Sequence, residues 1–289
     1  MTLTRERITL ICIAIPALSL VSCTTPDAVS KFSASAVTTL TSAKPVFNDM
    51  KQSCLRAVSS REGLATFTLP PESNTSCTEI GTQAVGVVAA VKILSDYFSA
   101  INALASFGSA KAGTDAEALL TKTGAAFGAN SATQTALGSI AKILTSAATA
   151  GYQQKQLEKD LTKVSGNVPT VVDALLSIVN NDYLGALGRE ESDLSNRYLR
   201  FVRDNSTDRA LSPEARLMLD DRWHADEAVL AAKRASAQSL VSALEALSKG
   251  FKELVAASAH PLTAKEAPGL LGPYVTQLQA LIPQIQKAF

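Results

Sequence analysis

Apolar residues recur along most of this chain at the three- and four-residue spacings of an α-helix. Residues 80–105 show the pattern most clearly, as two seven-residue series: Ile80, Val87, Leu94, Ile101 and Ala84, Val91, Phe98, Ala105. Residues 230–254 repeat it with Leu230, Ala237, Leu244, Phe251 and Leu240, Leu247, Leu254. Paired heptad series are typical of helices that pack in coiled-coil fashion. The pattern therefore predicts an all-α fold.

The whole pattern predicts an elongated antiparallel bundle of about five or six helices. We expect helices near residues 27–58, 80–105, 114–164, 171–204, 213–258 and 274–287. Pro45 and Gly128 mark expected breaks, and Pro283 an expected bend. Residues 59–74 and 268–273 are rich in Gly, Pro and Ser, which predicts loops.

The fourth and fifth predicted helices should form one long antiparallel hairpin. A short polar segment, residues 205–211, separates them. Ser212 followed by Pro213 is typical of a helix start, because Ser caps free backbone N–H groups and Pro fits the first helical position. The charged residues of the fourth helix gather in its second half, which indicates an exposed, polar end of the hairpin.

Composition agrees with helices and argues against a nucleic-acid partner. Hydrophobic residues make up 46% of the 289 residues and aromatic residues only 5%. Much of the hydrophobic set is Ala, the strongest helix former. Because 27 Lys and Arg residues nearly cancel 26 Asp and Glu residues, the totals impose no basic face.

The first 23 residues carry an export pattern. Arg5 and Arg7 precede an apolar run over residues 8–21, which is shorter than the ~20 residues that a membrane-spanning helix needs. This favours a signal peptide over a permanent membrane anchor. The run ends in Leu20-Val21-Ser22-Cys23, which resembles the lipobox of bacterial lipoprotein signal peptides. The resemblance implies cleavage before Cys23 and a lipid on its thiol.

The resemblance also sets the expected organisation of the chain. Residues 1–22 would be the signal peptide, 23–27 a lipidated tether, and 28–289 the helical body, with sub-parts near 28–165 and 168–289. So short a tether should hold the body close to the bilayer. Position 25 is Thr rather than the Asp that favours inner-membrane retention in enterobacterial lipoproteins. We therefore expect the periplasmic face of the outer membrane if the organism is Gram-negative.

Two cysteines remain in the predicted body. Cys54 and Cys77 lie 23 residues apart in an exported chain, where disulfides form readily. A redox or metal-binding pair is the alternative, but the spacing is not CxxC and no His lies nearby. We expect a structural disulfide.

A search for catalytic chemistry nominates no residue. His224 lies among Asp220, Asp226 and Glu227, which could form a surface metal site or a proton relay, but a solvated helix face is the simpler interpretation. The chain contains no HExxH, GxSxG or P-loop motif. We therefore expect no catalytic residue, no metal and no cofactor.

These patterns favour a non-catalytic, membrane-anchored interaction protein of the cell envelope. Its partner would be an envelope or effector protein, so that it either scaffolds a complex or neutralises a toxin. The candidate contact residues are Tyr183, Arg189, Arg197 and Arg200.

Two other functions are weighed against it. The Gly- and Ala-rich residues 80–130 suggest a membrane-active protein that resembles α-helical pore-forming toxins, although Lys92 and Asp96 argue against insertion. An enzyme is the third hypothesis, and a convergent polar cleft would favour it.

Overall fold

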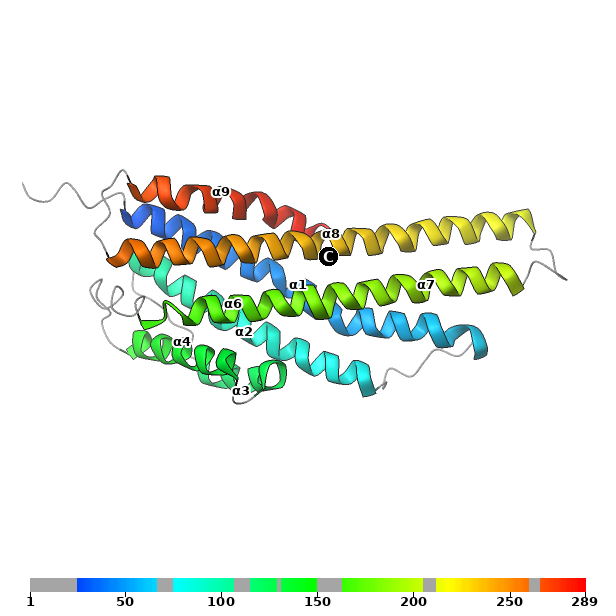
Figure 1. Ribbon diagram of the computed structural model, residues 1–289, viewed down its shortest axis with the longest axis horizontal. Helices are drawn as coiled ribbons and strands as arrows, with labels where there is room; N and C mark the ends of the chain where they lie inside the picture. The colour runs from blue at the N-terminus through cyan, green and yellow to red at the C-terminus, as the bar shows by residue number, and fades with distance from the viewer. Residues whose placement is uncertain are drawn as a thin grey trace, which may run out of the picture.

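The computed structural model describes residues 25–66, 75–106, 115–128, 131–149, 163–204, 212–259 and 266–289. These residues form an all-α, helix-packed fold without a strand, as the heptad pattern predicts (Figure 1). In chain order the elements are α1 (Thr25–Thr66), α2 (Thr75–Ala105), α3 (Ala116–Phe127), α4 (Ala132–Thr149), α6 (Asn167–Ser177), the π-helical η1 (Ile178–Tyr183), α7 (Leu184–Asp204), α8 (Pro213–Ala259) and α9 (Glu266–Gln286).

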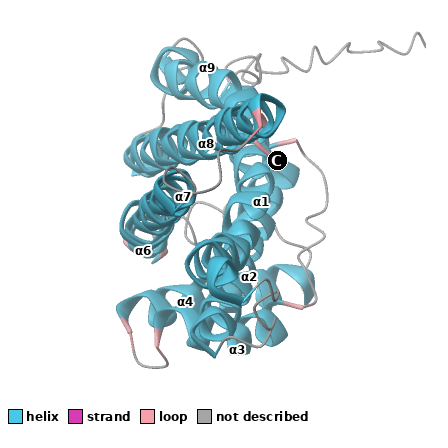
Figure 2. Ribbon diagram, turned by 90° about the vertical axis from the view of Figure 1, so that its right-hand side faces the viewer, coloured by secondary structure: helices cyan, strands magenta, loops and turns pink. Residues whose placement is uncertain are grey.

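Helix α1 is the central element of the bundle. It contacts α2 on one side and α7, α8 and α9 on the other. The end-on view shows α1 between α2 and the α8–α9 pair, with α3 and α4 beyond α2 (Figure 2). Because α1 packs with helices from both predicted sub-parts, one hydrophobic cluster runs through the described body.

Four aromatic rings join α1, α2 and α8 inside this cluster. Phe32, Tyr97, Phe98 and Phe251 meet edge to face, with ring centroids 5.7–6.2 Å apart. Phe32, Phe98 and Phe251 have no exposed surface. Edge-to-face pairs add about 0.5–1.5 kcal/mol each beyond the area they bury. The heptad positions of α2 and α8 therefore lie in the core, as predicted.

Two helix boundaries differ from the sequence prediction. Helix α1 passes through Pro45 without a break and continues to Thr66, so residues 59–66 are helical and not a loop. Pro45 is exposed, and the carbonyl left without its N–H partner belongs to the exposed Thr41, which water can reach. The buried side chains of Leu40 and Val46 hold the helix in place on either side of that gap.

Helix α9 also begins earlier than predicted. Residues 268–273, expected as a loop, lie within it, and Pro268 occupies its first turn, where proline is tolerated. Helix α9 is retained because one side of it is buried in the bundle: Ala267, Leu271, Leu278 and Ile285.

The predicted break after residue 127 is confirmed. Helix α3 ends at Phe127, and Gly128 has a φ of 76°, a conformation that residues with a side chain rarely adopt. Helix α4 then starts with the Ser131 hydroxyl accepting a hydrogen bond from the Gln134 N–H at 3.1 Å. In the same way the Ser212 hydroxyl caps α8 by accepting from the Ala215 N–H at 3.2 Å, as predicted.

The elements build an elongated rod. Helix α1 starts at one end, and α7 ends and α8 begins at the opposite end (Figure 1). Helix α1 has 42 residues, which correspond to about 63 Å at 1.5 Å per residue. The end of α7 and the start of α8 are therefore far from the start of α1 (Figure 1).

We predict opposite effects for two glycine substitutions in helices. A Cβ at Gly250 would overlap the ring of Phe32 and lie 3.1 Å from Tyr274, whereas a Cβ at Gly124 would have no neighbour within 4 Å. Gly250→Ala should lower the free energy of unfolding by about 1–3 kcal/mol through overpacking. Gly124→Ala should raise it by about 0.5–1 kcal/mol. Urea unfolding followed by circular dichroism measures both, and equal shifts would contradict the α1–α8 packing.

Candidate functional site

A group of charged and polar side chains lies where α1, η1, α7 and α8 meet. We call it the ionic cluster: Asp49, Ser53, Arg56, Tyr183, Glu190 and Lys233. Asp49 is its centre. Its Oδ1 accepts hydrogen bonds from Arg56 Nη1 at 3.0 Å and Lys233 Nζ at 2.8 Å. Its Oδ2 accepts from Arg56 Nη2 and from the Tyr183 hydroxyl, both at 2.9 Å.

Glu190 is the second anion of the cluster. Its Oε2 accepts from the Ser53 hydroxyl at 2.6 Å and from Arg56 Nη2 at 3.2 Å, and its Oε1 accepts from Arg56 Nε. Arg56 therefore bridges both carboxylates. Asp49, Glu190 and Lys233 are each at most 8% exposed, so helices distant in sequence are joined by ion pairs within the bundle.

The cluster is electrostatically self-compensated. Burial would raise the pKa of Asp49, but hydrogen bonds from Arg56 and Lys233 outweigh it and hold that pKa below its usual 3.8. Burial would likewise lower the pKa of Arg56, but hydrogen bonds to Asp49 and Glu190 raise it. Burial and the charge of Asp49 both raise the pKa of Tyr183. At neutral pH the carboxylate of Asp49 and the guanidinium of Arg56 are therefore charged, and the phenol of Tyr183 is neutral.

The arrangement suits structural work better than catalysis. A carboxylate has about four lone-pair sites, and four donors occupy those of Asp49. A general base needs a free lone pair within hydrogen-bond reach of its substrate, and Asp49 offers none. The cluster therefore acts chemically as a joint between helices.

The π-helical segment η1 positions Tyr183 in this joint. The buried residues Leu175, Val179, Tyr183 and Leu187 follow one another at four-residue intervals. Four residues of a regular α-helix turn about 40° beyond a full circle, so this row would drift away from the core. The wider turn of η1 removes the drift and keeps all four side chains buried.

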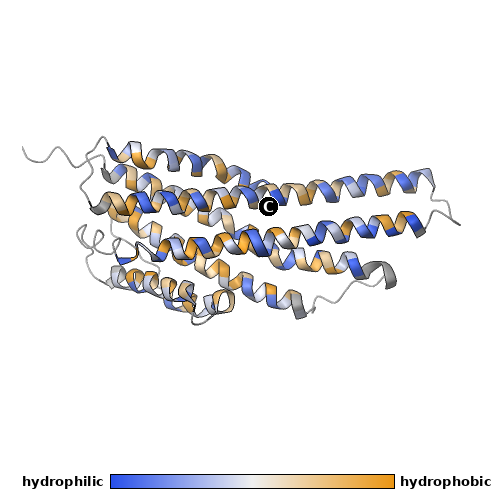
Figure 3. Ribbon diagram, in the orientation of Figure 1, coloured by the Kyte–Doolittle hydropathy of each residue, from blue (hydrophilic) through white to orange (hydrophobic). Residues whose placement is uncertain are grey.

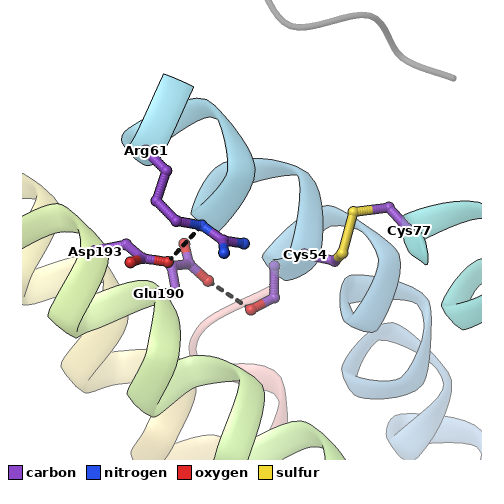
Figure 4. Close-up of a disulfide and its surroundings, with 6 residues drawn as sticks. Cys54, Arg61, Cys77, Glu190 and Asp193 are labelled. Atoms are coloured by element: carbon purple, nitrogen blue, oxygen red, sulfur yellow. Dashed lines mark hydrogen bonds and ion pairs between the residues drawn. A yellow bond between two sulfur atoms is a disulfide. The ribbon is translucent and has the colours of Figure 1, made fainter. Parts of the chain in front are cut away.

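The last turns of α1 are fastened on both sides. Cys54 forms a disulfide with Cys77 of α2, as predicted. On the opposite side Arg61 Nε lies 3.1 Å from Asp193 Oδ2 of α7. Figure 4 shows the disulfide facing α2, while Arg61, Glu190 and Asp193 lie between α1 and α7. This part of α1 therefore supports the base of the α7–α8 hairpin.

Beyond this joint α7 and α8 continue as a hairpin, with the last turns of α1 beside α7 (Figure 1). We call residues 194–203 of α7 and 213–230 of α8 the hairpin tip. Tyr198 packs edge to face on Trp223 with centroids 4.9 Å apart, and the Tyr198 hydroxyl donates to Asp226 Oδ2 at 3.1 Å. Most other side chains of the tip are exposed, and Figure 3 shows hydrophilic turns alternating with hydrophobic ones there.

The hairpin tip also exposes large apolar side chains. Among the described residues, five of the seven exposed large hydrophobic side chains lie on the tip. They are Leu199 at 65%, Val202 at 54%, Leu217 at 63%, Met218 at 72% and Val229 at 53% exposure. Because exposed apolar patches can mark protein–protein interaction sites, the hairpin tip is a candidate interaction surface.

Of the predicted contact residues, Arg197 and Arg200 lie on the hairpin tip, Arg189 lies before it on α7, and Tyr183 belongs to the ionic cluster. Arg189, Arg197 and Arg200 are exposed on α7 and form no ion pair with the described residues. Tyr183 is fully buried in the ionic cluster, so it cannot contact a partner. Its flanking Asn and Asp residues made it look exposed, but the π turn directs it inward.

Other predicted positions have simpler outcomes. Cys23 lies outside the described residues, as does the predicted signal peptide. His224 is exposed, 3.6 Å from Asp220 and 3.7 Å from Glu227. Within the described ranges no group of three or more His, Cys, Asp or Glu residues could hold a metal ion.

Sequence analysis missed the other members of the ionic cluster, although the heptads contained the signal. Lys233 stands seven residues before Leu240 and so continues the core series Leu240, Leu247, Leu254. Glu190 stands seven residues after Tyr183 in the same way. Charges at core heptad positions predict buried ion pairs, but the heptads could not identify the partners, which are Asp49 for Lys233 and Arg56 for Glu190, both on α1.

Comparison with known proteins gives no further guide. No protein family matches this chain, and no curated protein or solved structure is significantly similar to it.

We predict that Asp49→Asn destabilises the fold at neutral pH. The substitution leaves Lys233 buried beside an uncharged amide, and breaking a buried ion pair typically costs about 3–5 kcal/mol. The exposed Asp27 pairs with Lys31 at 2.7 Å, and Asp27→Asn, as the matched control, should cost less than about 1 kcal/mol.

The effect of Asp49→Asn should depend on pH. Because the folded-state pKa of Asp49 is lowered, its contribution is complete above its usual pKa and is lost as the pH falls through the folded value. Urea unfolding at about pH 7 and about pH 2 should therefore show a difference between parent and variant that shrinks in acid. A difference that does not change with pH would contradict the conclusion that the Asp49 carboxylate is charged in the folded protein.

Proposed function

We propose that this chain is a lipid-anchored, non-catalytic lipoprotein of the bacterial envelope that presents its hairpin tip to another protein. The anchor is Cys23, and the partner is an envelope or effector protein. In a Gram-negative organism the expected location is the periplasmic face of the outer membrane.

The start of α1 supports attachment close to the bilayer. Helix α1 begins at Thr25, two residues after Cys23, so part of the expected tether, residues 23–27, is already helical. A lipid on Cys23 would then hold the first turn of α1 near the headgroups. Diacyl and N-acyl chains together give lasting attachment, since each buried CH₂ contributes ~0.8 kcal/mol.

The observation that carries the proposal is the position of the exposed apolar residues. They gather on the hairpin tip, at the end of the rod opposite the start of α1 (Figure 1). With the rod axis along the membrane normal, the tip stands about 60 Å from the bilayer surface. An anchored rod with an apolar far end is suited to holding a partner at a set distance from the membrane.

A membrane-active protein is the second candidate, and α2 provides the observation in its favour. Residues Cys77–Ala105 are long and apolar enough to cross a membrane, with a mean hydropathy of 1.6, but 72% of that window is buried inside the bundle. The disulfide also ties the first turn of α2 to α1. Burial in a soluble core explains these features without insertion.

Two readouts from the same bacterial cells test the proposal. For the anchor, cells are fed labelled palmitate: the parent chain should carry the label and Cys23→Ser should not, because serine has no thiol to accept the lipid. Equal labelling of both would refute the anchor.

For the tip, a photo-crosslinking amino acid replaces Leu199, and the matched control replaces Val85, which is 56% exposed on α2. We expect a discrete protein adduct from position 199 and none from position 85. The same adducts from both positions, or none from either, would count against the hairpin tip as an interaction site.

A further inference from the structure

We infer that the partner of the hairpin tip is the hairpin tip of a second copy of this chain, related by a two-fold axis along the hairpin. The inference rests on the proposed function and names the partner of the same surface. The apolar face, the charge distribution and the position of the anchor each contribute a separate step.

The first step is that three of the exposed apolar residues share one face of the hairpin. Leu199 and Val202 lie about 100° and 40° around α7 from Tyr198, and Leu217 lies about 120° around α8 from Trp223 in the same sense. In an antiparallel pair of helices, residues that are displaced in the same rotational sense from the two contacting residues lie on the same face of the pair. Tyr198 contacts Trp223, so Val202 and Leu217 also lie near the same level along the hairpin.

This face is open to solvent on the side away from α1. Glu190 and Lys233 each lie about 80° from Tyr198 and Trp223 in the opposite sense, and both contact α1 through the ionic cluster. Leu199, Val202 and Leu217 therefore point away from the body, where a second hairpin can pack flat against them.

The second step is that the two helices of the tip carry opposite charge. Residues 194–203 of α7 contain three Arg and no acidic residue, while residues 213–227 of α8 contain five acidic residues and two Arg. A two-fold axis along the hairpin stacks α7 of one copy on α8 of the other, which brings opposite charges together. A two-fold axis across the hairpin would stack α7 on α7, and the arginines would repel one another.

One pair of residues makes this arrangement specific. Arg200 lies about 200° around α7 from Tyr198 and Asp221 about 160° around α8 from Trp223, both measured in the sense used for the apolar face, so both point to the outer edges of the hairpin. They stand at the same level but on opposite edges, and cannot meet within one chain. In the two-fold arrangement Arg200 of each copy lies on the same edge as Asp221 of the other.

The third step concerns the anchor. A two-fold axis along the hairpin leaves both copies pointing the same way, so both α1 helices start at the same end of the dimer. Two copies with lipid on Cys23 could then associate while anchored in one bilayer. The interface is isologous, because the same surface serves both copies.

The test uses the full chain in the membranes of its own bacterium, produced in two differently tagged forms. A photo-crosslinking amino acid at Leu217 should give an adduct of twice the chain mass that contains both tags and no other protein. Leu199→Glu should abolish this adduct, because it places a charge in the apolar contact. Val85→Glu, on α2, should leave it unchanged.

Charge exchange tests the orientation. Arg200→Glu alone and Asp221→Arg alone should each reduce the adduct about tenfold, since each places like charges together twice in the dimer. Producing the Arg200→Glu chain together with the Asp221→Arg chain should restore adducts that carry both tags. Circular dichroism of each purified variant confirms that the helices are retained.

The outcomes separate this inference from the proposed function. An adduct at Leu217 with a different protein would overturn self-association and leave an interaction lipoprotein. A two-tag adduct that charge exchange does not restore would overturn the two-fold arrangement. Absence of any adduct from the tip would overturn both.

Discussion

A buried carboxylate is tolerated only when opposite charges and donors replace the water it has lost. Asp49 meets this condition through Arg56, Lys233 and Tyr183, which come from α1, α8 and η1. Each of these partners is needed, because removing one would leave the rest of the buried cluster without a charge or donor that it depends on. The relative positions of three helices are therefore set by a single side chain on α1.

Such a cluster contributes more to register than to stability. Replacing a buried ion pair with well-packed apolar residues is often neutral or stabilising, whereas a polar group at a core heptad position can define how helices align. Lys233 and Glu190 occupy such positions in α8 and α7. A slip of either helix by one heptad would leave a buried charge without its partner. The cluster therefore excludes shifted helix alignments that the apolar repeats alone would allow.

The packing of the α7–α8 hairpin changes at the ionic cluster. On the body side α8 packs among α1, α6 and α9, and its heptad residues from Ala237 to Phe251 are fully buried. On the tip side α7 and α8 contact each other through Tyr198 and Trp223, and of α1 only the last turns lie beside α7 (Figure 1). The rigid joint at the base allows the two-helix tip to stand apart from the bundle and expose apolar residues at its far end.

Helix type and packing could be predicted from sequence because heptads record core positions directly. Thus α2, α8 and the cysteine pair agree with prediction. The continuation of the helices through Pro45 and residues 268–273 could not be predicted, because packing along the rest of each helix outweighs the effect of a local proline. Tyr183 was predicted as a contact residue but is buried, because a linear sequence pattern does not distinguish a π-helical turn from a regular α-helical one. Asp49 was missed because two of its partners, Tyr183 and Lys233, lie 134 and 184 residues away.

Hydrogen exchange of the intact chain, resolved along α8, tests most directly whether the ionic cluster separates a rigid body from a projecting tip. The account predicts a step near Lys233: amides of residues 237–251 should exchange at least about tenfold more slowly than those of residues 215–225, because the tip can open without disturbing the bundle. Uniform protection along α8, or a tip more protected than the body, would contradict it.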